Sequence, residues 1–250
     1  MSSVIIGVDE AGRGPALGPL VVSSICIPSG DLPHLESIGA NDSKMMSMSE
    51  REKVESSILR EAMSRNWRVC RIPISAKTID QERSIRNLNI IEIERFVQAI
   101  LEVSDYDSKG CVNVDLLGSD PREFSKIMQK RICELRPGLK VKSDVGMDGI
   151  CASTGAASIL AKVMRDSRIS EISEEVGFDV GSGYPSDSKT IEAIRILTSG
   201  DMPNANLRWT WSTVSRIWSE RHNSPVPIRT SKGALIQQSL NSSFSEEGAR

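Results

Sequence analysis

The stretch VIIGVDEAGRGPALGP, residues 4–19, constrains the fold of this chain more than any other segment. It opens with the apolar run 4–8, whose β-branched residues are typical of a buried strand. Two adjacent acids, Asp9 and Glu10, follow, and glycines and prolines then form a loop that cannot continue as a helix. The pattern predicts two carboxylates where a buried strand meets a stiff loop.

Further β-branched runs predict four more strands, and helical periodicity fills most of the chain between them. The strands are expected at 20–27, 67–74, 111–115 and 139–143, and the helices at 49–65, 87–103, 121–132, 156–172 and 188–199. Ser49 and Glu52 have the spacing of a capping box for the first helix. Strands and helices mixed in this way indicate an α/β domain whose sheet is covered by helices.

The C-terminal part of the chain has a different composition. Residues 223–250 are rich in Ser, Pro and Asn and have little apolar periodicity, which predicts a flexible tail. The folded domain is therefore expected to span residues 1–222.

Cysteine and histidine usage restricts the chemistry. The five cysteines include no C-x-x-C pair, which argues against a disulfide framework or a zinc ribbon. The chain has no basic signal-peptide start and no apolar run long enough to span a membrane. We therefore expect a cytoplasmic protein that does not bind membranes. With only His34 and His222 available, a metal site would be built from carboxylates, which suit Mg²⁺ or Mn²⁺.

Charge alone does not decide whether the partner is a nucleic acid. The formal net charge is −2, whereas duplex-binding domains usually have a basic footprint. Residues 208–232, however, include five basic side chains and one acidic side chain. The local excess leaves nucleic-acid binding open.

Two more acids could join Asp9 and Glu10. Asp115 ends the predicted strand CVNVD, and Asp148 lies just before a predicted helix, where Asp144 competes with it. An acid after a strand can also solvate a turn or cap a helix. As a group, the acids suggest two-metal phosphodiester chemistry.

Several other side chains could contact a nucleic acid. Arg13 lies between Gly12 and Gly14, in a loop whose backbone can approach a ligand closely, and could contact phosphate. Ser158, Lys162 and Arg165 fall on one helix face that either meets phosphate or is solvated, and Tyr184 on the loop GSGYPSD could stack on a sugar or cover an apolar edge.

The motifs, taken in order, resemble those of the ribonuclease HII family, also called type 2 ribonuclease H, with an archaeal character. The similar segments are GVDEAGRGPALGPLVV, DSK at 42–44, NLN at 87–89, VNVD, AASILAKVMRD and GSGYPSD. The resemblance covers residues 4–220. Type 3 relatives carry an N-terminal substrate-binding domain, for which a first strand starting at residue 4 leaves no room.

The resemblance implies a ribonuclease-H-like fold, with a five-stranded mixed sheet flanked by helices and a helical C-terminal region. It implies an endonuclease that cuts the RNA strand of RNA–DNA hybrids. It also implies cleavage 5′ of single ribonucleotides embedded in duplex DNA, as in ribonucleotide excision repair, leaving 5′-phosphate and 3′-hydroxyl ends.

The same resemblance assigns roles to individual residues. The catalytic acids that bind two Mg²⁺ or Mn²⁺ ions would be Asp9, Glu10, Asp115 and Asp148. Backbone groups of Gly12, Arg13 and Gly14 would read the 2′-hydroxyl, Tyr184 would pack on the deoxyribose beyond the scissile phosphate, and Lys44, Ser158 and Lys162 would hold phosphates.

The sequence departs from the family pattern at two places. Gly146 and Met147 precede Asp148 where family members commonly have Lys-Ala, so a basic residue beside this acid is missing. Gly155 stands where a Ser is more usual.

The tail contains one further motif. Gln237, Leu240 and Phe244 resemble a sliding-clamp-binding peptide, except that Ser243 replaces an aromatic residue. The alternative is a featureless end of the chain. We expect a monomer.

Two other functions fit the residues. One is another two-metal nuclease of the same fold that acts on DNA or on junctions. The other is a non-catalytic nucleic-acid-binding module, which the four acids argue against because carboxylates repel phosphate.

Overall fold

The computed structural model describes residues 3–40, 46–115, 121–230 and 233–235. The strands are β1 (Val4–Ala11), β2 (Leu20–Pro28), β3 (Arg68–Ile74), β4 (Gly110–Asp115), β5 (Leu139–Asp144), β6 (Ile228–Thr230) and β7 (Gly233–Leu235). The helices are η1 (Ser29–Asp31), α1 (Leu32–Ser37), α2 (Met48–Arg65), α3 (Ala76–Arg83), α4 (Leu88–Val103), α5 (Pro121–Leu135), α6 (Met147–Ile150), α7 (Ala152–Val176), α8 (Ser188–Leu197) and α9 (Ser212–His222). None of the helices in these ranges is long and apolar enough to cross a membrane.

The predicted five-stranded mixed sheet is confirmed. Its strand order is β3-β2-β1-β4-β5, and β1, at the centre, is antiparallel to β2 and parallel to β4. The parallel pair matters for the site, because parallel strands end at the same edge of a sheet. Val8 and Val114 form the last pair between β1 and β4, so Asp9 and Asp115 follow that pair side by side.

The first strand is longer than its apolar run predicted. β1 continues through Asp9 and Glu10 to Ala11, and all three residues pair with β2. On its other side, pairing with β4 stops at Val8 and Val114. Asp9 and Glu10 thus pair with β2 on one side and lie beyond the last residue pair with β4 on the other.

The chain forms two compact units. The first comprises residues 1–13, 19–74 and 86–168, and the second comprises residues 14–18, 75–85 and 169–250. The sequence pattern had suggested one catalytic domain over 1–222, whereas the division here falls within α7, after Arg168.

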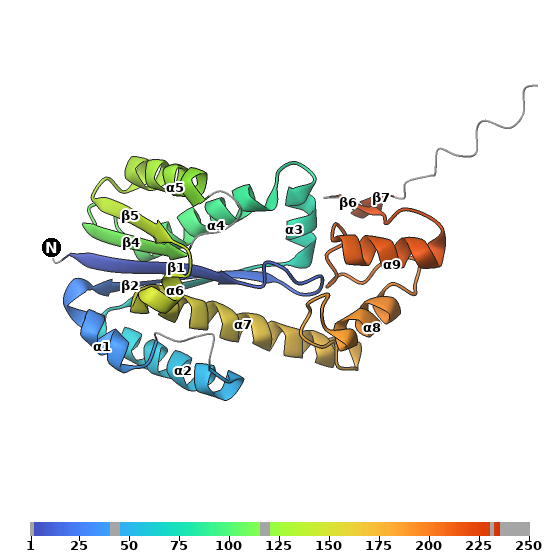
Figure 1. The fold of residues 1–250 in the computed structure, drawn as a ribbon, viewed down its shortest axis with the longest axis horizontal. Coiled ribbons are helices and arrows are strands. Elements are labelled where there is room, and N and C mark those ends of the chain that lie inside the picture. The colour runs from blue at the N-terminus through green and yellow to red at the C-terminus, as the bar shows by residue number, and fades with distance from the viewer. Residues whose placement is uncertain (1–2, 41–45, 116–120, 231–232, 236–250) are drawn as a thin grey trace, which may run out of the picture. The chain divides into compact units, whose positions relative to one another are not determined.

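In the first unit, helices cover both faces of the sheet (Figure 1). Helices α4 and α5 pack on one face. On the other, the apolar side chains of β2, α1 and α2 form a buried cluster with Ala152, Ala156 and Leu160 of α7. This packing fixes α7 along the sheet.

The second unit has its own apolar core. The last turns of α7, helices α8 and α9 and the loop 14–18 contribute to it, with Leu17, Ile194, Leu207 and Val214 fully buried. Its helices correspond to the helical C-terminal region that the family resemblance implied.

The helix at 48–65 begins earlier than predicted. Ser47, and not Ser49, is the N-cap: the Glu50 backbone N–H donates to its hydroxyl, and the Glu50 carboxylate accepts from the Ser47 N–H at 2.7 Å. The sequence contains the S-x-x-E spacing twice, two residues apart, and the first occurrence caps the helix.

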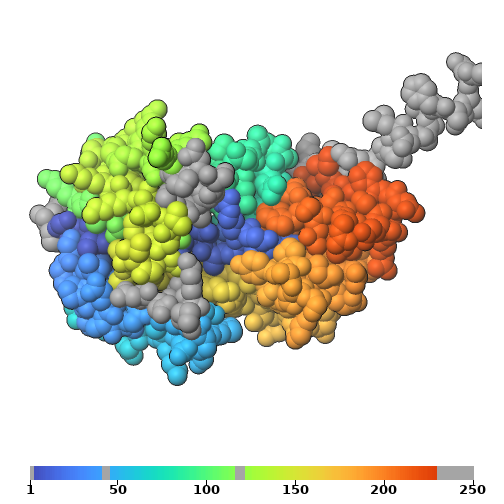
Figure 2. All heavy atoms as spheres, viewed as in Figure 1, coloured from blue at the N-terminus to red at the C-terminus, as the bar shows by residue number. Residues whose placement is uncertain are grey.

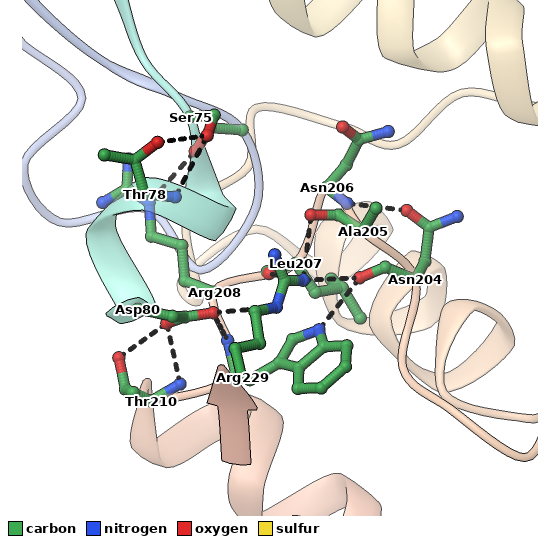
Figure 3. A network of polar contacts seen from close by, with 12 residues as sticks. Ser75, Thr78, Asp80, Asn204, Ala205, Asn206, Leu207, Arg208, Thr210 and Arg229 are labelled. Atoms are coloured by element: carbon green, nitrogen blue, oxygen red, sulfur yellow. Dashed lines mark hydrogen bonds and ion pairs between the residues drawn. The ribbon is translucent and has the colours of Figure 1, made fainter. Parts of the chain in front are cut away.

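The start of the predicted tail is anchored by Arg229. This side chain is 8% exposed, forms an ion pair with Asp80 at 3.3 Å and lies over the Trp209 ring (Figure 3). Its Nη2 donates to the backbone carbonyls of Asn204, Ala205 and Leu207. A Ser- and Pro-rich composition could not reveal this anchor, because its partners lie far back in the sequence. The interpretation of 223–230 as a flexible tail is therefore wrong for Arg229 and its neighbours, and residues 236–250 lie outside the described part.

Candidate active site

Three carboxylates interact at one edge of the sheet in the first unit. Asp9 and Asp115 each follow the last paired residues of two parallel neighbouring strands. The charge of Asp115 acts on both Asp9 and Glu10. The topology therefore brings together acids that lie about a hundred residues apart in the sequence.

The local environment disfavours the ionised forms of the two neighbouring acids. Burial, and then the charge of Glu10, raise the pKa of Asp9 well above its usual value, and only 4% of Asp9 is exposed. Burial raises the pKa of Glu10 to about 7. The Oε2 atom of Glu10 is buried and has no hydrogen-bond partner among the described residues. This edge of the sheet therefore favours a bound cation.

A backbone contact places the short helix that carries Asp148 beside the end of β4. The Met147 N–H donates to Oδ1 of Asp115 at 2.9 Å, which fixes the short helix α6 beside the end of β4. Asp148 is 3% exposed, whereas the competing Asp144 is exposed. Burial does not test the choice of Asp148 over Asp144, which stays a prediction.

The unusual Gly155 allows two backbone segments to approach α7 closely. A Cβ at this position would lie 2.0 Å from the carbonyl oxygen of Ala40 and 2.8 Å from that of Asp148. A Ser at this position would force both segments away. The departure from the family pattern thus matches the local packing around Asp148.

The helix face carrying Ser158 and Lys162 contacts carboxylates of the protein itself. The Ser158 hydroxyl hydrogen-bonds Asp9 and lowers its pKa, in opposition to burial. Lys162 Nζ donates to Asp166 at 2.7 Å, and the buried Arg165 also donates to Asp166, at 3.0 Å. The face is therefore neither a simple solvated surface nor a free row of phosphate ligands.

The loop of Gly12, Arg13 and Gly14, called the glycine loop below, is tightly packed at Gly12. Gly12 has φ +88°, and a Cβ there would lie 2.6 Å from the Pro19 carbonyl oxygen and 3.2 Å from Cγ of Arg165. No other residue type fits both the conformation and the space.

Arg13 contacts helix α4. Its guanidinium forms an ion pair with Glu92 and donates to Oδ1 of Asn89 at 2.7 Å. Neither Glu92 nor Asn89 was predicted as a site residue, although Asn89 belongs to the NLN motif. Glu92 gave no signal, because an acid within an apolar helix cannot be matched to its partner by spacing.

In the second unit, Gly14 lies beside Tyr184. The Tyr184 ring carbon Cε1 would be 3.4 Å from a Cβ on Gly14, and the Trp211 indole N–H donates to the Gly14 carbonyl at 3.1 Å. Tyr184 follows Gly183, whose carbonyl accepts from the Ala16 N–H at 2.9 Å. Gly14 and Tyr184 are thus neighbours within this unit.

The role of Lys44 and the binding of metal by the four acids stay predictions. Lys44 lies outside the described residues. Across the described residues, no three His, Cys, Asp or Glu side chains form a ready-made metal site. Assignment of metal to the four acids therefore belongs to the proposal below.

The mixed five-stranded sheet and the acids at its edge define a nuclease of the ribonuclease H class. The sequence profile of the ribonuclease HII family matches residues 6–214. Ribonuclease HII of Methanococcus maripaludis strain C5 is 31% identical over 225 residues, which cover 89% of this chain and 90% of the relative.

Solved structures agree. Ribonuclease H2 from Pyrococcus horikoshii OT3 is similar with a TM-score of 0.77 and 30% identity, over 88% of this chain and 100% of that one. The ribonuclease HII in a PCNA complex from Archaeoglobus fulgidus has a TM-score of 0.72 and 29% identity, over 84% of this chain and 95% of that one. The chain belongs to the ribonuclease HII family. It is an endoribonuclease of the ribonuclease H type, which acts on RNA–DNA hybrids.

Proposed function

We propose that this enzyme also cuts 5′ of single ribonucleotides in duplex DNA, by two-metal hydrolysis that leaves 5′-phosphate and 3′-hydroxyl ends. The observation that carries the proposal is the group of interacting carboxylates Asp9, Glu10 and Asp115 at one edge of the sheet. We assign Asp148 to the same group, because the preceding Met147 N–H donates to Asp115.

The residues at this edge fit divalent cations. Oxygen ligands suit Mg²⁺ and Mn²⁺, and the buried Oε2 of Glu10 accepts no hydrogen bond from any residue that the structure describes. Mg²⁺ is commonly held by one or two carboxylates together with substrate phosphates, so the acids need not form a complete cage before the substrate binds. When bound, the two ions would activate the attacking water and stabilise the leaving oxygen.

The side chains around the acids would hold them in place. Ser158 hydrogen-bonds Asp9, and the Met147 N–H orients Asp115. Lys162, which is 34% exposed, would reach a substrate phosphate from its position beside Asp166. Lys44 would add a second phosphate contact.

Ribose recognition is assigned to the loop of Gly12, Arg13 and Gly14. The tight packing of Gly12 fixes the backbone, so its amides and carbonyls can be aimed at a 2′-hydroxyl, the group that distinguishes RNA from DNA. The Tyr184 ring next to Gly14 would pack on the adjacent deoxyribose.

A sliding clamp is the proposed protein partner, and we expect the enzyme itself to be a monomer. The Archaeoglobus fulgidus relative was solved in complex with PCNA. Gln237, Leu240 and Phe244 of this chain resemble a clamp-binding peptide and lie outside the described residues. A pull-down with the cognate clamp should succeed with the intact chain and fail with Phe244→Ala; equal capture of both would remove the clamp assignment.

The substrate assignment is tested by cleavage of three labelled duplexes: an RNA–DNA hybrid, duplex DNA with one ribonucleotide, and all-DNA duplex. We expect cleavage of the first two, with the cut in the second on the 5′ side of the ribonucleotide. Cleavage of the all-DNA duplex, or of a junction, without cleavage of the single-ribonucleotide duplex would contradict the proposal.

A further inference from the structure

Helix α4 contains a fully buried acid that the catalytic chemistry does not use. Glu92 is 0% exposed and forms an ion pair with Arg13 of the glycine loop. Neither carboxylate oxygen of Glu92 has another hydrogen-bond partner among the described residues. Arg13 is therefore the group that compensates this buried charge.

The energetics of burial tie the two side chains together. An unpaired carboxylate in the protein interior is strongly destabilising, so removing Arg13 would leave the buried charge of Glu92 without compensation. If Arg13 turned toward solvent or toward a substrate, the buried Glu92 carboxylate would lose its ion-pair partner. The ion pair thus restrains the glycine loop.

A second contact from the same helix turn fixes the direction of the guanidinium. Asn89 accepts from Nη2 of Arg13 at 2.7 Å, and the turn itself is capped by Asn87, whose side chain accepts from the Ile90 N–H at 3.0 Å. Two contacts from a capped helix hold a planar guanidinium far more rigidly than one contact from a loop.

We propose that Glu92 is a positioning residue for ribose recognition: through Arg13 it fixes the backbone of the glycine loop against the substrate. Because Glu92 and Asn89 engage the guanidinium, the Arg13 side chain anchors the loop and is not a phosphate ligand. The inference rests on the proposed ribose-reading role of this loop and adds the group that holds it in place.

The same helix provides a matched control. Glu94, two residues further along, also forms an ion pair, with Arg86, but its side chain is 28% exposed, whereas Glu92 is fully buried. The two arginines are similarly exposed, at 30% for Arg86 and 31% for Arg13, so the pairs differ in the burial of the acid. An ion pair in which the acid is also exposed contributes little, and Glu94 has no part in the proposed site. Glu94→Gln therefore changes the same residue type on the same helix without touching the loop.

The first experiment measures kcat and KM on the RNA–DNA hybrid and on duplex DNA with one ribonucleotide, for the wild type, Glu92→Gln and Glu94→Gln. For Glu92→Gln we expect kcat to fall about 10- to 100-fold with KM within about threefold, because a displaced loop misplaces the scissile bond while phosphate contacts remain. Glu94→Gln should match the wild type. Glu92→Gln kinetics within twofold of the wild type would overturn the inference.

A second pair of variants separates anchoring from phosphate binding. Arg13→Met alone leaves Glu92 buried without its partner and should lower kcat at least tenfold. The double variant Arg13→Met, Glu92→Leu replaces the ion pair with apolar side chains and should recover most of kcat, even if Glu92→Gln alone does not fold. A double variant as slow as Arg13→Met would mean that Arg13 acts on the substrate, and the inference would fail.

The two substrates keep this inference distinct from the proposed function. A wild type that cuts the hybrid but not the single-ribonucleotide duplex would contradict the proposed function. The effect of the Glu92 variants could still be measured on the RNA–DNA hybrid, where ribose recognition is also required.

Discussion

Asp9 and Asp80 are both buried aspartates, and their surroundings differ in one respect that separates the proposed catalytic site from a structural network. Asp80, 2% exposed, accepts from the backbone N–H groups of Trp209 and Thr210 and from the Thr210 hydroxyl, and pairs with Arg229 (Figure 3). Asp9, 4% exposed, accepts from the Glu10 N–H and from Ser158, and faces two further acids.

Burial raises the pKa of both aspartates, but among the described residues Asp80 has the ion-pair partner Arg229, whereas Asp9 has two acids as its charged neighbours. At Asp80 the donors and Arg229 lower the pKa in opposition to burial. At Asp9 the neighbouring charges of Glu10 and Asp115 add to the effect of burial. A site whose charge is not balanced by the protein is one that a cation from solution can complete.

Asp9→Asn or Asp115→Asn should have the largest effect on activity. Removal of one carboxylate should lower kcat by about 10³-fold or more, since a bound cation supplies several kcal/mol of transition-state stabilisation. Hybrid binding should persist, and the metal-free variant should be at least as stable as the wild type because carboxylate repulsion is relieved. Steady-state cleavage, gel-shift binding and urea unfolding measure the three quantities. Full activity in both variants would disprove the assignment of these acids.

Asp80→Ala should have the opposite effect and lower stability rather than activity. It leaves Arg229 buried without its partner, which should cost about 3–5 kcal/mol of unfolding free energy. For a chain of this size, that loss corresponds to a fall in melting temperature of roughly 10 °C, measurable by circular dichroism. A variant as stable as the wild type would contradict the structural role of the network.

The pH dependence of stability in EDTA should show the titration of Glu10 at the proposed catalytic site. Because the pKa of Glu10 is raised from 4.5 to about 7, its contribution to stability is full below pH 4.5 and is lost as pH rises through 7. The loss is on the order of 3 kcal/mol. The unfolding free energy, measured by urea denaturation from pH 4 to pH 8, should therefore fall more steeply with pH in the wild type than in Glu10→Gln. Parallel curves would exclude Glu10 as the titrating group.

Matched hydroxyl deletions should give the smallest effects. Ser158→Ala removes a hydrogen bond that lowers the pKa of Asp9, so the acidic limb of the pH–rate profile should move to higher pH, with roughly a three- to tenfold loss of rate near neutrality. Thr210→Val removes the corresponding donor to Asp80 and should cost about 1 kcal/mol of stability without moving the profile. A shift in the pH–rate profile of Thr210→Val would contradict a purely structural role of Asp80.

Sequence patterns identified the parts of this molecule that depend on local chemistry. The apolar strands, the helix from Asn87 onward and the order of the family motifs led to the correct sheet and family. Asp9, Glu10 and Asp115 could be singled out because acids directly follow or end β-branched runs. Even so, the run 4–8 could not show that β1 continues through both acids, because that extension comes from pairing with β2.

Contacts between distant segments could not be predicted in the same way. Asp80 bonds to residues 129 and 130 positions later, and Arg13 bonds to a residue 76 positions later. Arg229 lies in a segment whose composition indicated a tail, and the short helix α3 that carries Asp80 has too few apolar residues to predict. Tertiary contacts determine these features, and neither propensity nor spacing encodes them.

The central claim is that the acids at the edge of the sheet require a cation that the protein itself does not provide. The most direct test is the unfolding free energy at pH 8 as Mg²⁺ or Mn²⁺ is added without substrate, for the wild type and for Asp9→Asn. We predict that the wild type gains about 2–3 kcal/mol at cation concentrations about 100-fold above the dissociation constant, and that Asp9→Asn gains much less. Equal gains in the two proteins, or none in the wild type at millimolar cation, would contradict the claim.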